Sequence, residues 1–310
     1  MKLKALFLTF FAFFNSFLLS NTLFSETPEE AGFKISLNSE KANNGFRGEV
    51  SEMKMILEDA HGTKISRKMK GKIMETKEDG DKSISQFLLP ADVRGTMMLT
   101  WTHKKKDDDQ WLFLPSIKRT KRISSSSKSA SFMGSEFSYE DLGSQEVEKY
   151  THKLIKEEKN QDGLSMWLIE RTPKNKKSGY KRLKTWIIKK YNNPSKVEYF
   201  DRKNELLKTA TFSDYREYKV GGKSLWRANK IHMVNVQTGK KSTITWSNRK
   251  LGVEFDEDEF EMFSRLKELI QKLNKISNLT RLTEGDDYWI SQVYDSIWPL
   301  FINSNKLFEN

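Results

Sequence analysis

Residues 107–142 read DDDQWLFLPSIKRTKRISSSSKSASFMGSEFSYEDL, and they decide which fold the sequence favours. Trp111–Leu114 are apolar at every position, which predicts a strand buried on both faces. This strand leads into four cations within residues 118–122 and a run of serines, after which Phe132 and Phe137 restore aromatic character. The segment after the strand is therefore too polar for an ordinary core strand and too aromatic for a plain linker.

On both sides of this stretch, apolar and polar residues alternate from residue 50 to residue 246, with turns between the alternating runs. Met53, Met55 and Leu57 share one strand parity, and Asp79-Gly80 is typical of a hairpin turn. The pattern predicts about eleven or twelve consecutive strands. Because strand twist forces a sheet of that size to curl or close, we expect a mainly β protein with a single curved antiparallel sheet or an open barrel.

The N-terminal residues have the features of a secretory signal peptide. Met1–Lys4 is a short cationic region, Ala5–Leu19 is predominantly apolar, and a polar segment begins at Ser20. The apolar stretch is shorter than the roughly 20 residues that a membrane span requires. We therefore expect a cleaved signal peptide at residues 1–20 and export to the periplasm, with an uncleaved membrane anchor as the alternative.

Composition limits the classes of function and of partner. The chain has 310 residues, a net charge of +12 and no cysteine, which excludes disulfides, thiolate metal sites and an acylated cysteine. The positive charge suits anionic lipid headgroups or an acidic partner. Nucleic acid is not an expected partner, because an exported protein rarely meets it.

The sequence contains no recognisable catalytic or metal-binding arrangement. Its four histidines are far apart, and it has neither a phosphate-binding glycine loop nor a nucleophile elbow. Acidic residues cluster at 107–109 and 256–261, where a turn and a helix start explain them. We therefore expect a protein that is not an enzyme and has no catalytic residue, metal ion or cofactor.

Methionine and tryptophan are concentrated in the predicted strands. Methionine side chains are flexible and polarizable, so they suit surfaces that fit variable apolar partners. One or two helices can cover only part of a large curved sheet, so we expect an apolar cavity on its concave side. An ordinary core is the alternative for any one of these residues. The residues predicted to line the cavity are Met53, Met55, Leu57, Ile65, Met69, Met97, Leu99, Trp101, Trp111, Phe113, Trp167 and Trp186.

Helices are expected at both ends of the mature chain. Thr27-Pro28-Glu29-Glu30 is typical of a helix start. Residues 256–274 are acidic and then helical in pattern, and residues 288–301 carry a second apolar cluster at helical spacing. That cluster is too short to span a bilayer. We expect it to form a mobile cover over the groove, with docking on a partner and disorder as the alternatives.

Residues 95–142 resemble the LolA-like outer-membrane lipoprotein-sorting family, especially its branch associated with resistance-nodulation-division (RND) or MMPL-type transporters. The matching elements are Gly95-Thr96, Trp111–Pro115 and, most specifically, Phe132–Leu142. The similarity extends from about Thr27 to Leu266. It implies a half-open antiparallel β-barrel with covering helices, whose inner surface accepts acyl chains.

The resemblance also implies a division of the chain and roles for particular residues. Residues 27–273 would form the half-barrel domain, between the signal peptide and a short helical C-terminal extension at residues 274–310. An aromatic flap over the cavity mouth would consist of Phe132, Met133 and Phe137. Contacts with phosphate headgroups or an acidic partner, near Asp141, would come from Lys118, Arg119, Lys121 and Arg122. For this basic run, a solvated strand end is the alternative.

The leading hypothesis is a periplasmic carrier that binds lipid or lipoprotein acyl chains and ferries them between membranes. The resemblance implies an inner-membrane RND/MMPL-type transporter as its partner. The basic residues of 118–122 and 171–190 predict affinity for an anionic membrane surface, weakening with salt. One alternative is a module that senses mislocalised lipoproteins and regulates a membrane partner. A secreted hydrolase is a further alternative, for which no catalytic constellation is assembled.

Overall fold

The computed structural model describes residues 26–117, 119–255 and 260. The expected signal peptide, the extension at residues 274–310 and the predicted helix of residues 256–274, apart from Phe260, lie outside these residues, as does Lys118. Within the described part of the chain, no helix combines the length and the apolar character needed to cross a membrane.

The described chain begins with the helix α1 (Pro28–Asn43), which Thr27 caps. The Glu30 N–H donates to Thr27 Oγ1 at 3.2 Å, and the Thr27 N–H donates to Glu30 Oε2 at 2.9 Å. Pro28 lies in the first turn together with Glu29 and Glu30, where the helix dipole favours acidic side chains. The helix start predicted from these four residues is confirmed.

In the described residues, thirteen strands form one sheet in which all neighbours are antiparallel. The predicted single antiparallel sheet is confirmed, with 13 strands in place of eleven or twelve. In chain order the strands are β1 (Gly48–Glu58), β2 (Lys64–Met74), β3 (Lys82–Leu89), β4 (Met97–Trp101), β5 (Asp109–Leu114), β6 (Arg119–Arg122), β7 (Tyr150–Lys159), β8 (Ser165–Pro173), β9 (Tyr180–Ile188), β10 (Asn193–Asp201), β11 (Leu206–Val220), β12 (Lys223–Asn235) and β13 (Lys241–Leu251). Three short 3-10 helices are η1 (Pro115–Ile117), η2 (Tyr139–Asp141) and η3 (Val147–Lys149).

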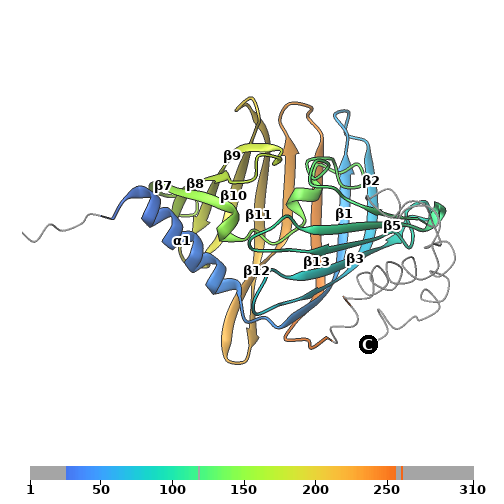
Figure 1. Ribbon diagram of the computed structural model, residues 1–310, viewed down its shortest axis with the longest axis horizontal. Helices are drawn as coiled ribbons and strands as arrows, with labels where there is room; N and C mark the ends of the chain where they lie inside the picture. Colours follow the sequence, from blue (N-terminus) through green and yellow to red (C-terminus); the bar gives the residue numbers. More distant parts are fainter. Residues whose placement is uncertain (1–25, 118, 256–259, 261–310) are drawn as a thin grey trace, which may run out of the picture.

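The strand order explains why one side of the sheet is covered by the chain. β1 and β13 pair in the middle, and the order runs outward to β6 at one edge and β7 at the other. Because β6 and β7 are consecutive in the chain, residues 123–149 must cross from edge to edge. They cross on the concave side, which α1 also covers near β7 (Figure 1). We call the concave side the inner face and the convex side the outer face.

The main core lies between the inner face and residues 123–142. Residues paired directly across antiparallel strands share a face, so the pairs Met53–Met69 and Met55–Ile244 place these side chains together on the inner face. They pack in one buried cluster with aromatic residues of the crossing segment. The curved sheet therefore has its core on the concave side, as a half-open barrel requires.

Candidate functional site

A cavity of about 380 Å³ lies on the inner face between α1, residues 137–147 and strands β9–β12. Its deep wall is apolar, because inward-facing positions of four neighbouring strands carry aliphatic or aromatic side chains. We call it the apolar cavity, and its deep wall consists of Ile187, Val197, Ala210, Phe212, Ile231 and Met233.

The helix α1 covers this cavity and is attached to the sheet at both of its ends. Towards its start, Gly32 lies so close to β7 that an added Cβ would be 2.6 Å from the backbone nitrogen of Leu154. At its end, Arg227 of β12 donates to the Asn43 carbonyl oxygen at 3.0 Å and to Asn43 Oδ1 at 2.7 Å. Lysine and arginine side chains commonly satisfy the free carbonyls of a helix C-terminus. α1 therefore spans the space between β7 and β12 as a roof.

The helix α1 does not fill the space beneath it, because its buried residues are small. The buried residues of α1 are Gly32 and Ser36. Ser36 and His152 both line the apolar cavity, and Ser36 Oγ and His152 Nδ1 have no hydrogen-bond partner among the described residues. Burying an unpaired polar atom costs free energy. These two atoms therefore suit an occupant that carries a polar group beside its apolar part.

The rim of the apolar cavity carries charges of both signs. Carboxylates of Glu75, Asp81 and Glu146 lie there with the cations of Lys104 and Arg227. Burial raises the pKa of Asp81 to about 7, and the nearby charge of Glu146 raises it further. Burial likewise raises the pKa of Glu146. The rim therefore carries acidic as well as basic side chains.

The segment predicted as a flap is part of the core. Met133 and Gly134 both have positive φ and reverse the chain, so the Phe132 N–H donates to the Phe137 carbonyl oxygen at 2.7 Å. Phe132 is 1% exposed, and its ring lies 5.8 Å from the Phe87 ring of β3. Met133 is partly buried against the same cluster, while Phe137 also lines the apolar cavity. We call residues 123–142 the plug, because they fill one half of the inner face.

A buried ion pair holds the plug to the sheet. Lys208 Nζ of β11 lies 2.6 Å from Asp141 Oδ2 and donates to the Glu136 carbonyl oxygen at 2.8 Å. The Tyr180 hydroxyl donates to Asp141 Oδ1 at 2.8 Å. The side chains of Lys208 and Asp141 are only 4% and 6% exposed. The cation beside Asp141 is therefore Lys208, and not the basic run at 118–122 to which the sequence assigned it.

Two cations of the basic run, Lys121 and Arg122, do not line the apolar cavity. Arg122 Nη2 forms an ion pair with Asp109 Oδ1 at 2.6 Å, across the β5–β6 hairpin. Lys121 is exposed on the edge strand β6, which begins at Arg119.

The predicted cavity residues are distributed over both faces, and none of them, although all are described, lines the apolar cavity. On the inner face, Ile65 is 52% exposed. Trp167 pairs with Ile187 near the β7 edge and donates its indole N–H to Glu157 Oε1 at 2.9 Å. The inner-face residues that pack in or against the cluster beneath the plug are Met53, Met55, Leu57 and Met69.

The other predicted residues have the outward parity. Met98 and Leu112 belong to the inner cluster, so their sequence neighbours on β4 and β5 face outward. There the Trp101 indole N–H donates to the Phe260 carbonyl oxygen at 3.2 Å. A strand apolar on both parities is thus buried on both faces, as predicted for Trp111–Leu114. The outward set is Met97, Leu99, Trp101, Trp111, Phe113 and, on β9, Trp186.

Solved structures of other proteins share this fold, and two of them are also similar in sequence. An outer membrane lipoprotein-sorting protein domain from Vibrio parahaemolyticus is 40% identical, with a TM-score of 0.73, and the match covers 76% of this chain and 98% of that one. A DUF1329 family protein from Desulfovibrio piger is 31% identical, with a TM-score of 0.71, over 77% of this chain and 99% of that one. A LolA superfamily protein from Nitrosomonas europaea shares the fold at 18% identity and a TM-score of 0.58, over 73% of this chain and 96% of that one.

Two sequence comparisons add to these matches. A protein-family model that carries only the description "uncharacterized protein" matches residues 79–264. Over 53 residues, or 17% of the chain, the sequence is 60% identical to ribosomal RNA small subunit methyltransferase G of Prochlorococcus marinus strain MIT 9515. The chain spans about a fifth of the length of that curated relative, since the match covers 22% of it.

Proposed function

Because the chain belongs to the LolA-like outer-membrane lipoprotein-sorting family, we propose that it is a periplasmic carrier that binds the acyl chain of a lipid in the apolar cavity. The observation that carries this proposal is a cavity of about 380 Å³ with an apolar deep wall and a polar rim. Such a cavity can bury a hydrocarbon chain while its polar end remains at the rim.

The size and chemistry of the cavity suit this role. Cavities that bind small ligands typically have volumes of about 300–1,000 Å³ and apolar walls with a few polar groups. Each methylene group removed from water contributes about 0.8 kcal/mol. Several methylenes in contact with Val197, Ala210 and Met233 would therefore bind firmly without any catalytic step.

The finer parts of the proposal concern cargo transfer and partners. A carrier that works between membranes needs a donor and an acceptor, and we propose an inner-membrane RND/MMPL-type transporter as one of them. The net charge of +12 and the exposed Lys121 on an edge strand support a second contact, with an anionic membrane surface. The cargo is either a free lipid or the acyl chain of a lipoprotein, and the mass of the bound molecule would distinguish the two.

The test is to fill the cavity without changing charge. Ala210 is fully buried and faces the cavity from β11, so Ala210→Leu places a larger aliphatic side chain in the binding space. Ala228→Leu makes the same change on β12 at the opposite parity, outside the cavity lining, and serves as the matched control. Binding of a fluorescent fatty acid would be measured for both variants and for the unchanged protein, with circular dichroism as a check on folding.

We expect Ala210→Leu to weaken binding about tenfold, which corresponds to about 1.4 kcal/mol, and Ala228→Leu to leave it unchanged. Native mass spectrometry of protein purified from membranes should show a co-purifying lipid, and its mass would distinguish a free lipid from a lipoprotein. Recovery of unliganded protein alone, together with no saturable fatty-acid binding, would overturn the proposal.

A further inference from the structure

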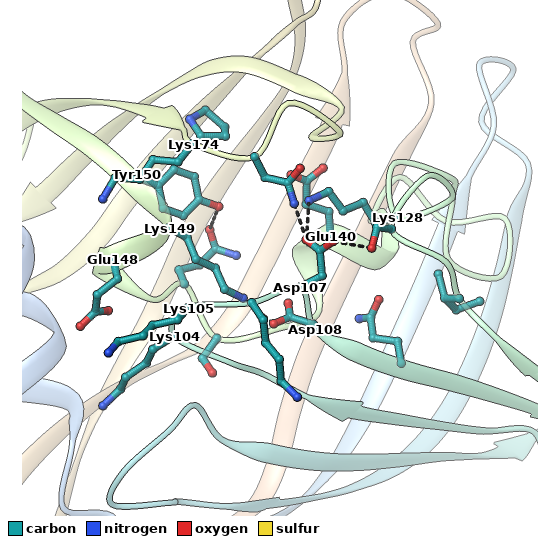
Figure 2. Close-up of a pocket in the computed structure, with 18 of the residues that line it drawn as sticks. Lys104, Lys105, Asp107, Asp108, Lys128, Glu140, Glu148, Lys149, Tyr150 and Lys174 are labelled. Atoms are coloured by element: carbon teal, nitrogen blue, oxygen red, sulfur yellow. Dashed lines mark hydrogen bonds and ion pairs between the residues drawn. The ribbon is translucent and has the colours of Figure 1, made fainter. Parts of the chain in front are cut away.

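A second cavity, of about 540 Å³, lies next to the first and is lined by lysines (Figure 2). It is bounded by residues 104–108 of the β4–β5 turn, residues 123–128 of the plug, residues 140–150 and residues 173–175 at the end of β8. We call it the lysine cavity. Its lysines come from all of these segments, and they are Lys104, Lys105, Lys106, Lys128, Lys149 and Lys174.

Four acidic side chains line this cavity: Asp107, Asp108 and Glu140 are engaged within its wall, whereas Glu148 is exposed. Asp108 forms an ion pair with Lys149. Asp107 accepts hydrogen bonds from Ser125 Oγ and Asn175 Nδ2. Glu140 accepts from the Gly179 N–H at 2.9 Å and from Ser178 Oγ. These carboxylates therefore have partners other than the remaining lysines.

Three of the lysines keep their charge available. The ammonium groups of Lys104, Lys105 and Lys174 make no hydrogen bond or ion pair of 4.0 Å or less with any part of the chain that the structure describes. Lys104 and Lys105 line the lysine cavity from the β4–β5 turn, and Lys174 lines it from the end of β8. Six lysines and four carboxylates line this cavity, so its net potential is positive and favours an anion.

The turn that carries two of these lysines is rigidly positioned. His103 Nδ1 lies 2.5 Å from Asp79 Oδ2 and its Nε2 lies 3.1 Å from Asp109 Oδ2. The Lys104 N–H donates to Asp79 Oδ1 at 2.8 Å. The two contacts with Asp79 tie the β4–β5 turn to the β2–β3 turn. The fold therefore sets the backbone positions of Lys104 and Lys105.

The two cavities share part of their walls. Lys104, Ser144 and Gln145 line both the lysine cavity and the apolar cavity. A molecule with an anionic end and a hydrocarbon end could therefore occupy both at once, with Lys104 at the junction. The lysine cavity alone offers no comparable apolar wall, and the apolar cavity alone offers a rim of mixed charge.

From this arrangement we propose that the two cavities form one site for an amphiphile that carries a phosphate-type anion. Its acyl chain lies in the apolar cavity, and its anion lies among Lys104, Lys105 and Lys174. A point charge such as lysine is a common phosphate partner. This inference rests on the proposed function for the position of the acyl chain, but it adds the charge and class of the headgroup.

Three probes separate the contributions of the two ends. A monoacylglycerol phosphate carries both ends, the monoacylglycerol of the same chain length carries only the apolar end, and glycerol phosphate carries only the anion. Calorimetric titration of the full chain with each probe, below the concentration at which the lipids form micelles, gives three dissociation constants. We expect the phosphate-bearing lipid to bind at least about tenfold more tightly than the uncharged one, and glycerol phosphate to bind more weakly than either lipid.

The matched variants remove equal charge inside and outside the lysine cavity. The cavity variant is Lys104→Gln, Lys105→Gln and Lys174→Gln combined. The control is Lys219→Gln, Lys230→Gln and Lys240→Gln, three exposed lysines outside the cavity lining. We expect the cavity variant to lose about tenfold in affinity for the phosphate-bearing lipid. Its loss for the uncharged lipid should be much smaller, because Lys104 lines the apolar cavity but its charge has no anion to contact on that lipid. The control should change neither affinity.

The outcomes distinguish this inference from the proposed function. Equal binding of both lipids, unaffected by the cavity variant, would overturn the headgroup assignment and leave the acyl-chain cavity standing. Tight binding of glycerol phosphate that does not compete with the phosphate-bearing lipid would also overturn it, because the anion would then be a free phosphate in a separate site. Failure of both lipids to bind would overturn the proposed function itself.

Discussion

The two halves of the inner face are built from the same alternating strands but are covered in different ways. Over β1–β5 the plug inserts Phe132, whose ring packs against Phe87 and Tyr139. Over β9–β12 the cover is α1, whose buried residues are Gly32 and Ser36. The first half is therefore filled with large side chains, and the second half retains a cavity of about 380 Å³.

The difference shows that a cavity in a curved sheet depends on the cover as much as on the strands. A roof that buries only glycine and serine cannot fill the concavity above Ala210 and Val197. A plug held by Lys208 and Asp141 can fill the other side, because its aromatic side chains are directed into the core by buried polar contacts. The half under the plug is packed and contributes to the stability of the fold, whereas the half under α1 contains the apolar cavity.

The most direct test of this difference is to replace one phenylalanine by alanine in each half of the inner face. Phe132→Ala removes a ring that is 1% exposed and should lower the free energy of unfolding by about 3–5 kcal/mol. Phe212→Ala removes a ring at the wall of the apolar cavity and should cost only about 1–2 kcal/mol, because that ring is partly buried beside existing space. Chemical denaturation of delipidated protein, followed by circular dichroism, measures both values.

Equal losses in the two variants would contradict the division into a filled and a hollow half. A loss for Phe212→Ala that exceeds the loss for Phe132→Ala would reverse it. Fatty-acid binding provides an independent check on the same pair, since Phe212 lines the apolar cavity and Phe132 does not.

The next largest effect concerns the ion pair that holds the plug. Lys208→Met leaves the carboxylate of Asp141 buried without its cation and should cost about 3 kcal/mol, at the low end of the range for breaking a buried pair. The low end is expected because Tyr180 and the Ser138 N–H still donate to Asp141. Chemical denaturation measures the loss.

The control for this prediction removes the second charge as well. Lys208→Met combined with Asp141→Asn leaves no uncompensated charge, so the double variant should be more stable than Lys208→Met alone. A double variant whose losses simply add would mean that the two side chains do not interact, and the ion pair would not be what holds the plug.

Much of the fold was predictable because it depends on local patterns. Thr27–Glu30 gave the start of α1, since capping requires only neighbouring residues. The apolar run Trp111–Leu114 gave a strand buried on both faces, since both parities are apolar. The return of Phe132 and Phe137 indicated that the crossing segment meets the core, although not that it fills it.

The cavity was not predictable from the same patterns, because alternation identifies the face of a side chain but not what covers it. Ala210 and Val197 are ordinary inward residues, and they line a cavity only because α1 is attached near Leu154 and at Arg227, far away in the sequence. The methionine and tryptophan content was a poor guide for a related reason. Large side chains fill space, so they mark the packed half and the covered outer face. The small buried residues of α1 were the available signal.

The lysine cavity was missed because its lysines come from separate segments. A run such as 118–122 is visible in the sequence, whereas Lys104, Lys128 and Lys174 come together only in the fold. The visible run is partly neutralised, since Arg122 pairs with Asp109 across a hairpin. Lys174 belongs to the basic region 171–190, but the sequence did not show that this region meets the β4–β5 turn.

A pH-dependent effect lies at the rim of the hollow half, where burial raises the pKa of Asp81 to about 7 from an ordinary value of 3.8. Between these two values the folded protein holds a proton that the unfolded chain has released, so this carboxyl lowers stability as pH rises from about 4 to about 7. Glu146 and Glu75 reinforce the effect, and Arg227 opposes it. Asp81→Asn is neutral at every pH and should remove this component.

Thermal unfolding from pH 4 to pH 8 tests this, because Asp81→Asn should be more stable than the unchanged protein at pH 8 and equal to it near pH 4. Asp79→Asn is the control of opposite sign. Burial acts to raise the pKa of Asp79, but hydrogen bonds from His103 and from backbone N–H groups outweigh it and lower the pKa to about 2. Its stabilising contribution is present above pH 3.8 and is lost as pH falls towards 2, so Asp79→Asn should be less stable at pH 8. If both variants shifted the melting temperature in the same direction at pH 8, the opposite pKa shifts of Asp81 and Asp79 would be contradicted.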